Sequence, residues 1–299
     1  MELVELIQQG IEIEQNVPLS KYTFTKTGGP AEYLAFPRSQ KELEQLIYIV
    51  RNQNISLTII GNASNLIIRD GGVKGLVIIL TKMNQIKVLG DEVTAQAGAR
   101  IIDTAFNAAN KGLSGLEFAS GIPGSIGGAI YMNAGAYGGE IGSVVKEVQV
   151  LTRAGELKTY TKDKMVFSYR HSLVQDNGDI VLSATFALKK GQKRKILAEM
   201  NYLNALRQYK QPLEYPSCGS VFKRPTGHFV GPMIIAAGLQ GKQIGGAQDS
   251  MKHAGFIVNK GGATASDYLA LIELIQQKIK EKDGIDLQTE VRIIGDPVE

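Results

Sequence analysis

Residues Gly121 to Gly142 form a glycine-rich stretch that could bind a ligand. The stretch reads GIPGSIGGAIYMNAGAYGGEIG and holds eight of the chain's 34 glycines, and its one acid is Glu140, so it is unlike a solvated Gly/Ser linker. Glycine lets a backbone approach a flat or anionic ligand closely, and free N–H groups can face phosphate. Ser125 could cap a helix that begins at Ile126 and aim its positive end at that ligand. The alternative is a glycine-rich turn that packs two elements together.

A second glycine loop, Gly61-Asn62-Ala63-Ser64-Asn65, follows a short apolar strand at Ser56 to Ile60. A loop at the carboxyl end of a strand commonly receives a ligand in α/β sheets, although Asn and Gly also suit a tight turn. The two loops could clamp one extended ligand. Neither fits G-x-G-x-x-G, and no G-x-x-x-x-G-K-[ST] occurs, so Rossmann and P-loop chemistry are disfavoured.

Composition restricts the classes of partner. The formal net charge is +4 over 299 residues, and Lys and Arg alternate with Asp and Glu, so nucleic acid is not implied and anionic small molecules are favoured. One cysteine, Cys218, and three widely spaced histidines predict neither a disulfide framework nor a metal site. The first residues show no signal-peptide pattern, and no apolar run reaches the roughly 20 residues that span a bilayer. We therefore expect a cytosolic, metal-free protein that binds neither membranes nor nucleic acid.

Hydrophobic patterning predicts the elements that position these loops. Before the glycine stretch we expect a helix at Glu2 to Gln9, an extended segment at Leu19 to Thr27, a strand at Ala31 to Phe36, a Ser39-capped helix to Gln53, strands at Leu66 to Ile68, Leu76 to Leu80, Ile86 to Leu89 and Val93 to Ala97, and a helix at Ala99 to Asn110. After it we expect strands at Val144 to Thr152, Leu157 to Tyr160 and Ile180 to Leu188, a helix at Lys193 to Tyr209, a small helix at Val230 to Gly238, a strand at Phe256 to Asn259, a Ser266-capped helix ending before Gly284, and a strand at Glu290 to Ile294.

Three motifs resemble the FAD-binding domain of the vanillyl-alcohol oxidase type: TGGPAE at Thr27 to Glu32, GNASNL at Gly61 to Leu66 and GIPGSIGG at Gly121 to Gly128. That fold holds FAD between two α+β subdomains. The resemblance implies FAD contacts from Gly61, Asn62, Ala63, Ser64, Asn65, Leu66, Gly121, Pro123, Gly124, Ser125, Gly127, Gly128, Ala129, Asn133 and Gly135.

Three further motifs are similar to those of the UDP-N-acetylenolpyruvoylglucosamine reductase family: FSYRHS at Phe167 to Ser172, SCGSVFKRP at Ser217 to Pro225 and TEVRIIG at Thr289 to Gly295. The match runs in order from about Ser20 to Gly295. The chain lacks the tyrosine-bearing insertion of the first structural class, so it resembles the second class, and which residues close over the substrate stays open. The resemblance implies NADPH-dependent reduction of UDP-N-acetylglucosamine enolpyruvate to UDP-N-acetylmuramate for peptidoglycan synthesis.

The same resemblance assigns three catalytic residues. Hydride would add to the terminal carbon of the enolpyruvyl group, and negative charge would spread into the carboxylate as an enolate. Arg170 would hold and neutralise that carboxylate, and Ser220 would deliver the proton. Glu290 would either stabilise the enolate as a protonated acid or orient a neighbouring donor. Taken singly, these residues also suit a surface cation, a Gly-Ser turn and a loop charge.

Substrate contacts are implied for residues that flank the catalytic motifs. Tyr169, Lys210, Lys223 and Arg224 are candidates for the diphosphate because most of them bring positive charge. His253 either faces the sugar nucleotide or serves as a hydrogen-bonded structural histidine. We interpret Cys218 as a structural thiol, because no His/Asn arrangement specifies thiol catalysis.

The resemblance also predicts the domain organisation, which is α+β throughout. FAD-binding subdomains are expected at 1–82 and 83–207, followed by a substrate domain at 208–299. Because no histidine precedes His171, we expect FAD to be bound non-covalently. The resemblance implies that NADPH and the substrate take turns in one cleft beside the flavin, and we expect a monomer. The alternatives are another FAD oxidoreductase of this fold, such as an alcohol or 2-hydroxy acid oxidase, or a non-catalytic sugar-nucleotide binding protein.

Overall fold

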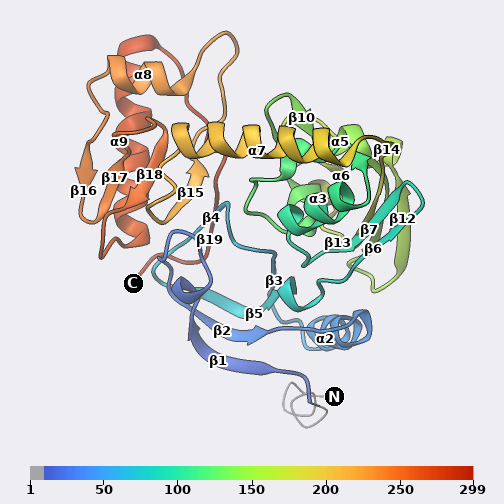
Figure 1. Cartoon of the computed structure of the whole chain (residues 1–299). Coiled ribbons are helices and arrows are strands. Elements are labelled where there is room, and N and C mark those ends of the chain that lie inside the picture. Colours follow the sequence, from blue (N-terminus) through green and yellow to red (C-terminus); the bar gives the residue numbers. More distant parts are fainter. Residues whose placement is uncertain (1–9, 299) are drawn as a thin grey trace. The chain divides into compact units, whose positions relative to one another are not determined.

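The computed structural model describes residues 10–298, and the predicted helix at Glu2 to Gln9 lies outside them. The described chain forms two compact units. Unit 1 contains residues 10–15, Tyr33–Asn62 and Gly75–Arg207, and unit 2 contains Asn16–Glu32, Ala63–Lys74 and residues 208–298. Both units combine helices with mostly antiparallel sheets (Figure 1), which confirms the α+β class. The division into domains at 1–82, 83–207 and 208–299 stays a prediction.

The first sheet has the strand order β1-β2-β5-β3, with bounds of Ile13–Pro18, Pro30–Ala35, Val73–Ile79 and Leu57–Ile60 respectively. β3 and β5 run parallel, with Leu57 opposite Leu76. Helix α2 (Gln40–Asn52) connects β2 to β3 and buries an apolar face made of Leu43, Leu46, Ile47 and Val50. The Ser39 hydroxyl accepts the Glu42 N–H at 3.2 Å, which confirms the predicted N-cap.

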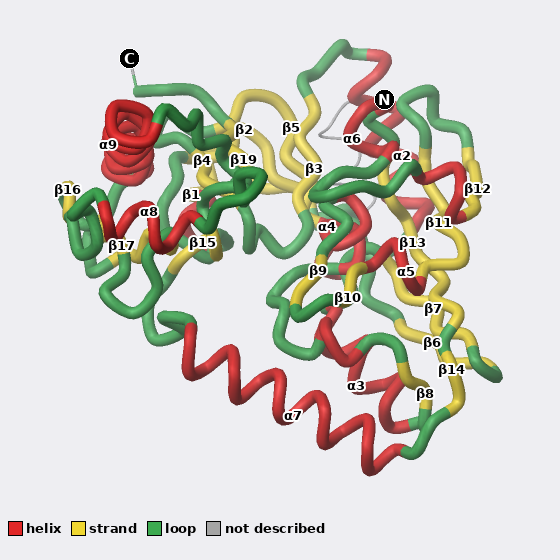
Figure 2. The backbone as a smooth tube through the Cα atoms, turned by 90° about the horizontal axis from the view of Figure 1, so that it is seen from above, coloured by secondary structure: helices red, strands yellow, loops and turns green. Residues whose placement is uncertain are grey.

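Unit 1 contains a five-stranded antiparallel sheet. Its order is β12-β11-β13-β7-β6, with bounds of Leu157–Thr161, Val145–Leu151, Ile180–Ala187, Glu92–Gln96 and Ile86–Leu89. Figure 2 shows these strands side by side. Helices α3 (Ile101–Asn110) and α4 (Ile126–Tyr131) both contact β7, and α3 buries its alanines, so its backbone lies close to its neighbours. The predicted strands and helix in this region are confirmed to within two residues at each end.

Short elements complete unit 1. They are β8 (Leu113–Ser114), which pairs with β14 (Lys189–Lys190), β9 (Gly135–Ala136), which pairs with β10 (Gly139–Glu140), α5 (Ile141–Val144) and α6 (Leu173–Asn177). The β9–β10 turn consists of Tyr137 and Gly138, with φ of 52° and 85°. Two positive φ values in a two-residue hairpin match the right-handed twist of the strands. Helix α7 (Lys193–Lys210) follows β14.

Unit 2 contains an antiparallel sheet in the order β15-β18-β17-β16, with bounds of Ser217–Ser220, Phe256–Asn259, Ala247–Asp249 and Gln243–Ile244. Helices α8 (Val230–Ala236) and α9 (Ala265–Asp283) share one apolar cluster with this sheet. The parallel pair β4 (Leu66–Ile68) and β19 (Arg292–Ile294) joins distant parts of the sequence within the unit.

The N-cap predicted for α9 was wrong. Thr264, not Ser266, is the N-cap: its hydroxyl accepts the Asp267 N–H at 3.0 Å, and the Asp267 carboxylate accepts the Thr264 N–H at 2.9 Å. This reciprocal pair is a capping box, which satisfies two backbone donors together. The Ser266 hydroxyl instead donates to Asp70 at 2.6 Å. The predicted end is confirmed, since Gly284 has φ of 69°.

The extended segment predicted at Leu19 to Thr27 was also wrong. Leu19–Lys21 is a single 3-10 turn, and bends follow it. The Thr23 hydroxyl donates to the Thr27 carbonyl at 2.7 Å, and the Thr25 and Thr27 hydroxyls lie 2.9 Å apart. Threonine hydroxyls that bond to nearby groups offer the chain an alternative to a strand, which the apolar pattern alone does not reveal.

Candidate active site

The two glycine loops meet within unit 1. The Asn62 side-chain amide donates to the Pro123 carbonyl at 2.6 Å. A Cβ atom at Gly61 would lie 2.2 Å from the Ser125 Oγ, so a larger residue at position 61 would displace the Ser125 hydroxyl. The first two residues of one predicted ligand loop therefore lie against the start of the other.

Helix α4 confirms the predicted Ser125 cap. The Ser125 hydroxyl accepts the Gly128 N–H at 3.3 Å. The N–H groups of Ile126 and Gly127 donate at 2.8 Å to the carbonyls of Ala99 and Ala97. Because the protein occupies these two donors, the N–H groups of Ile126 and Gly127 are not available to a phosphate. That the positive end of α4 faces the ligand stays a prediction.

Most glycines of the stretch pack against the protein itself. A Cβ at Gly127 would lie 3.2 Å from that of Ala97, one at Gly135 would lie 2.7 Å from the Gly139 carbonyl, and one at Gly142 would lie 2.9 Å from the Phe167 Cβ. At Gly128 the nearest atom would be the Ser125 Oγ at 3.5 Å, which is ordinary contact. The packing interpretation therefore explains several of these glycines, whereas the backbone at Gly128 has space beside it.

Asn133 links the glycine stretch to the turn that carries Arg170. Its side chain is buried, with the carbonyl accepting the Gly142 N–H at 2.8 Å and the amide donating to the Ser168 carbonyl at 3.0 Å. Asn133 also has φ of 41°. Ala129, another predicted FAD contact, is buried in α4. These two side chains hold the stretch in shape.

Arg170 lies at a strained position near that stretch. Ser168 and His171 exchange backbone hydrogen bonds of 3.2 and 3.1 Å, which closes a turn in which Arg170 has φ of 57°. Its guanidinium donates to the Gly135 carbonyl at 3.5 Å and lies 5.1 Å from the Tyr169 ring. A bulky residue in the left-handed region costs energy and persists where its surroundings require it. The structure thus places Arg170, Tyr169, Asn133 and Gly135 together.

Ser220 and Glu290 come together within unit 2. Ser220 ends β15, is exposed and pairs with Phe256 of β18. The Glu290 N–H donates at 2.7 Å to the carbonyl of Val221, the residue after Ser220. The Asn65 amide donates to the Glu290 carbonyl at 3.2 Å. These two hydrogen bonds join residues that are 69 and 225 positions apart in the sequence.

The rest of the second glycine loop, from Ala63 to Leu66, belongs to unit 2. Ala63 is buried with φ of 48°, and its carbonyl accepts the Phe24 N–H at 3.4 Å. Ser64 is half-buried, and Leu66 begins β4 opposite Arg292. Gly121, Pro123 and Gly124 lie in unit 1, where the Gly124 carbonyl accepts the Ile101 N–H at 3.0 Å.

The predicted substrate residues of unit 2 differ in setting. Lys210 is exposed at the end of α7, and the Lys223 N–H donates to Gln288. The Arg224 guanidinium stacks 3.7 Å from the Phe229 ring centroid. The His253 ring lies 4.7 Å from the Phe256 ring, and its Nδ1 is enclosed without a partner among residues 10–298.

Burial raises the pKa values of the Cys218 thiol and the Asp249 carboxyl in unit 2. Burial raises the pKa of the Cys218 thiol to about 12, so it stays protonated and inert, which supports its interpretation as a structural thiol. Burial also raises the pKa of Asp249 to about 7, although the Gly255 N–H donates to it at 3.0 Å. Sequence reasoning missed Asp249, because nothing in GGAQDS marks that carboxyl as buried.

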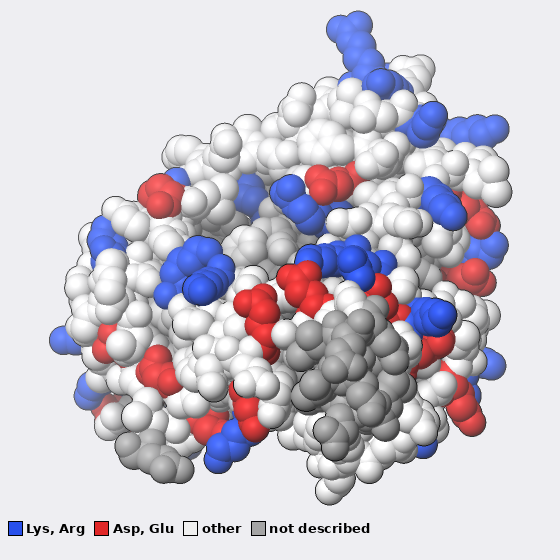
Figure 3. All heavy atoms as spheres, turned by 90° about the horizontal axis from the view of Figure 1, so that it is seen from below, with Lys and Arg blue, Asp and Glu red and all other residues white. Residues whose placement is uncertain are grey.

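Several classes of site are absent from the part of the chain that the structure describes. No group of three or more His, Cys, Asp or Glu side chains there could hold a metal ion. No helix within residues 10–298 is long and apolar enough to cross a membrane. Positive and negative side chains are interspersed on the face shown in Figure 3, in keeping with the mixed charge of the sequence.

Comparison with known proteins gives one consistent result. A family model described as UDP-N-acetylenolpyruvoylglucosamine reductase, C-terminal domain, matches residues 211–294, and one described as FAD binding domain matches residues 31–161. UDP-N-acetylenolpyruvoylglucosamine reductases of Lactobacillus helveticus and Lactobacillus delbrueckii subsp. bulgaricus are 73% and 69% identical, over 99% of this chain and 99% and 100% of theirs. The crystal structure of the Thermus caldophilus reductase superposes with a TM-score of 0.82 at 33% identity, covering 95% of this chain and 99% of that one.

Proposed function

This chain belongs to the UDP-N-acetylenolpyruvoylglucosamine reductase family, and we propose that Arg170, Ser220 and Glu290 carry out its reaction. The enzyme reduces UDP-N-acetylglucosamine enolpyruvate to UDP-N-acetylmuramate, a peptidoglycan precursor, with FAD as cofactor and NADPH as reductant. A UDP-N-acetylenolpyruvoylglucosamine reductase is 73% identical to this chain over 99% of both chains. A different reaction on the same fold is therefore a poor alternative.

The part of the two glycine loops that lies in unit 1 fits a flavin dinucleotide. A side chain at position 61 would collide with the Ser125 hydroxyl, so glycine lets the two loops approach each other. The Asn62 amide holds the Pro123 carbonyl by a hydrogen bond. Gly128 leaves its backbone approachable. We assign FAD binding to these residues together with the rest of the predicted set. FAD that NADPH has reduced supplies the hydride. Because the chain has no histidine before His171, we propose that FAD dissociates freely when the protein is denatured.

Arg170 receives the substrate carboxylate. Its guanidinium fork suits a carboxylate geometrically. The turn closed by Ser168 and His171 holds the side chain against the Gly135 carbonyl, next to the predicted flavin stretch. Positive charge fixed there before reaction stabilises the enolate as it forms.

Ser220 protonates the enolate carbon, and Glu290 supports it. Ser220 is exposed at the end of β15, so its hydroxyl is accessible to substrate. The bond from the Glu290 N–H to the Val221 carbonyl is the observation that carries this proposal, because it holds Glu290 beside the residue that follows Ser220. Asn65 fixes Glu290 from the other side. Tyr169, Lys210, Lys223, Arg224 and His253 remain our candidates for binding the sugar nucleotide.

The test is anaerobic flavin absorbance of the purified protein, with NADPH added first and the enolpyruvyl substrate second. Wild-type flavin should bleach and then recover. Ser220→Ala should bleach normally and recover about 10²- to 10⁴-fold more slowly, because only the proton donor is lost. Ser217→Ala, on the same strand, is the control. Equal losses in both half-reactions would assign Ser220 to folding, and bleaching without recovery in the wild type would assign the chain to another flavin oxidoreductase.

We further propose that the enzyme acts as a monomer in the cytoplasm, without nucleic-acid or membrane partners. The mixed surface charge and a water-soluble sugar-nucleotide substrate support this proposal. Size-exclusion chromatography with light scattering tests the monomer, and a mass twice that of one chain would contradict it.

A further inference from the structure

Arg207 of α7 is a cation that the proposed chemistry does not use. Its Nη1 donates to the carbonyl of Gly121, the first residue of the glycine stretch. A Cβ at Gly121 would lie 3.0 Å from the Arg207 Cδ and 2.6 Å from the Asn204 Oδ1, so α7 packs directly on this glycine. The guanidinium also donates to the hydroxyl of Tyr137 in the β9–β10 turn.

The charge of Arg207 is not balanced within the described chain. Its Nε is enclosed and has no hydrogen-bond partner among residues 10–298. Burial lowers the pKa of Arg207, and the Tyr137 hydroxyl opposes that shift, with no carboxylate of the described residues contributing. Arginine nevertheless stays charged in proteins. Arg207 is half-buried and its Nε is enclosed, and a cation withdrawn from water without a counter-charge is costly. We therefore expect an anion from outside the chain to complete the site.

The position of Arg207 indicates which ligand brings that anion. The guanidinium contacts Gly121 and Tyr137, which lie within the glycine-rich stretch Gly121 to Gly142 that we assign to FAD. The Ser120 hydroxyl, immediately before the stretch, donates to Asn204 on the same helix at 3.2 Å. We infer that Arg207 is a cofactor-positioning residue that binds an anionic group of FAD, an inference that rests on the proposed function.

FAD carries negative charge in two places: on its diphosphate in both redox states, and on its ring after reduction. Both groups accept charge-assisted hydrogen bonds from a guanidinium. A diphosphate contact changes the affinity for oxidised FAD. A ring contact leaves that affinity unchanged and makes the reduction potential more negative when it is lost, by about 30 mV for each tenfold change in relative affinity.

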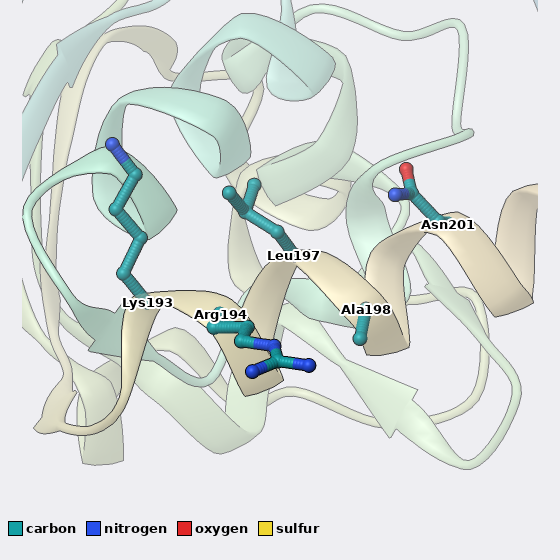
Figure 4. A pocket seen from close by; sticks show the side chains of 5 residues that line it. All are labelled: Lys193, Arg194, Leu197, Ala198 and Asn201. Atoms are coloured by element: carbon teal, nitrogen blue, oxygen red, sulfur yellow. The ribbon is translucent and has the colours of Figure 1, made fainter.

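The experiment titrates FAD into flavin-free full-length protein and follows flavin fluorescence, then measures the reduction potential of the loaded protein. If Arg207 binds the diphosphate, Arg207→Met should raise the Kd for oxidised FAD about 10- to 100-fold. If it binds the ring, Arg207→Met should make the reduction potential more negative. If the contact is to the diphosphate, added salt should weaken FAD binding more in the wild type than in Arg207→Met, since salt screens a charge contact and leaves packing unaffected. Arg194→Met is the matched control, because Arg194 is exposed on the same helix and points away from Leu197, which packs toward the core (Figure 4).

Arg207→Lys covers the case in which Arg207→Met fails to fold. Lysine keeps the charge and loses the fork, so its FAD binding should keep the wild-type salt dependence at lower affinity. The inference is overturned if Arg207→Met changes the Kd for oxidised FAD by less than about twofold and shifts the reduction potential by less than the amount that corresponds to a twofold change in relative affinity. It is also overturned if Arg207→Met weakens FAD binding and Arg207→Lys shows no more salt dependence than Arg207→Met. Wild-type protein that binds FAD and yet leaves the enolpyruvyl substrate unreduced would refute the proposed function and leave this test valid.

Discussion

Asp249→Asn should make the stability of unit 2 less sensitive to pH. Asp249 lies at the end of β17 with none of its surface exposed. One carboxylate oxygen accepts the Gly255 N–H at 3.0 Å, and the other is enclosed without a partner in the described chain. Burial therefore raises its pKa from 3.8 to about 7. Asparagine has nearly the same shape and keeps the acceptor, but it carries no charge to bury.

The sign and size follow from proton linkage. The unfolded chain releases the Asp249 proton at its ordinary pKa of 3.8, whereas the folded chain keeps it until about 7. Between these values the folded state binds more protons, so the free energy of unfolding falls by about 1.4 kcal/mol for each pH unit. The full loss approaches about 4 kcal/mol above both pKa values. From about pH 5 to about pH 8, Asp249→Asn should therefore gain about 3 kcal/mol relative to wild type.

Urea denaturation of both proteins across this pH range measures the difference, with the free energy taken from the transition of unit 2. The control is Asp283→Asn, which removes an exposed carboxylate from the end of α9 in the same unit and should track the wild type at every pH. If the free energies of unfolding of Asp249→Asn and wild type changed with pH in parallel, the reasoning would be refuted. That result would mean that other groups already stabilise the charge of the buried carboxylate.

Three further predictions concern single positions. Asp70→Ala should lower the free energy of unfolding by about 1 to 3 kcal/mol, because the Asp70 carboxylate accepts the N–H groups of Ala265 and Ser266 at 2.9 and 2.8 Å at the start of α9. An unchanged urea midpoint would contradict this. Gly61→Ala should raise the Kd for FAD about tenfold, because its Cβ would lie 2.2 Å from the Ser125 Oγ. Flavin fluorescence titration checks it, and Ser125→Gly in the same chain should restore binding if the clash is the cause. Arg170→Gly should be about 1 kcal/mol more stable than Arg170→Ala in thermal unfolding, because position 170 has φ of 57°, and an alanine variant of equal or greater stability would show that the turn carries no strain.

The sequence by itself determined the elements whose pattern is local. The apolar face of α2, its Ser39 cap and the Gly284 end of α9 depend on residues within a few positions of each other, and all were predictable. Where two local signals competed, the prediction failed: Thr264 and Ser266 are both good caps, and only the capping box with Asp267 selects Thr264. The family also followed from sequence, because its motifs are short and ordered along the chain.

Only the tertiary structure decided what individual polar groups and glycines do. Gly121 is a glycine because Asn204 and Arg207 pack on it, and Gly128 has space beside it, although both look alike in the sequence. Arg207 and Gly121 are separated by 86 positions, so neither the contact nor the unbalanced charge has a local signature. Asp249 likewise becomes abnormal through burial alone. Burial and hydrogen-bond partnership depend on contacts that are remote in sequence, and for this reason a residue's type and spacing cannot fix its charge state or its role.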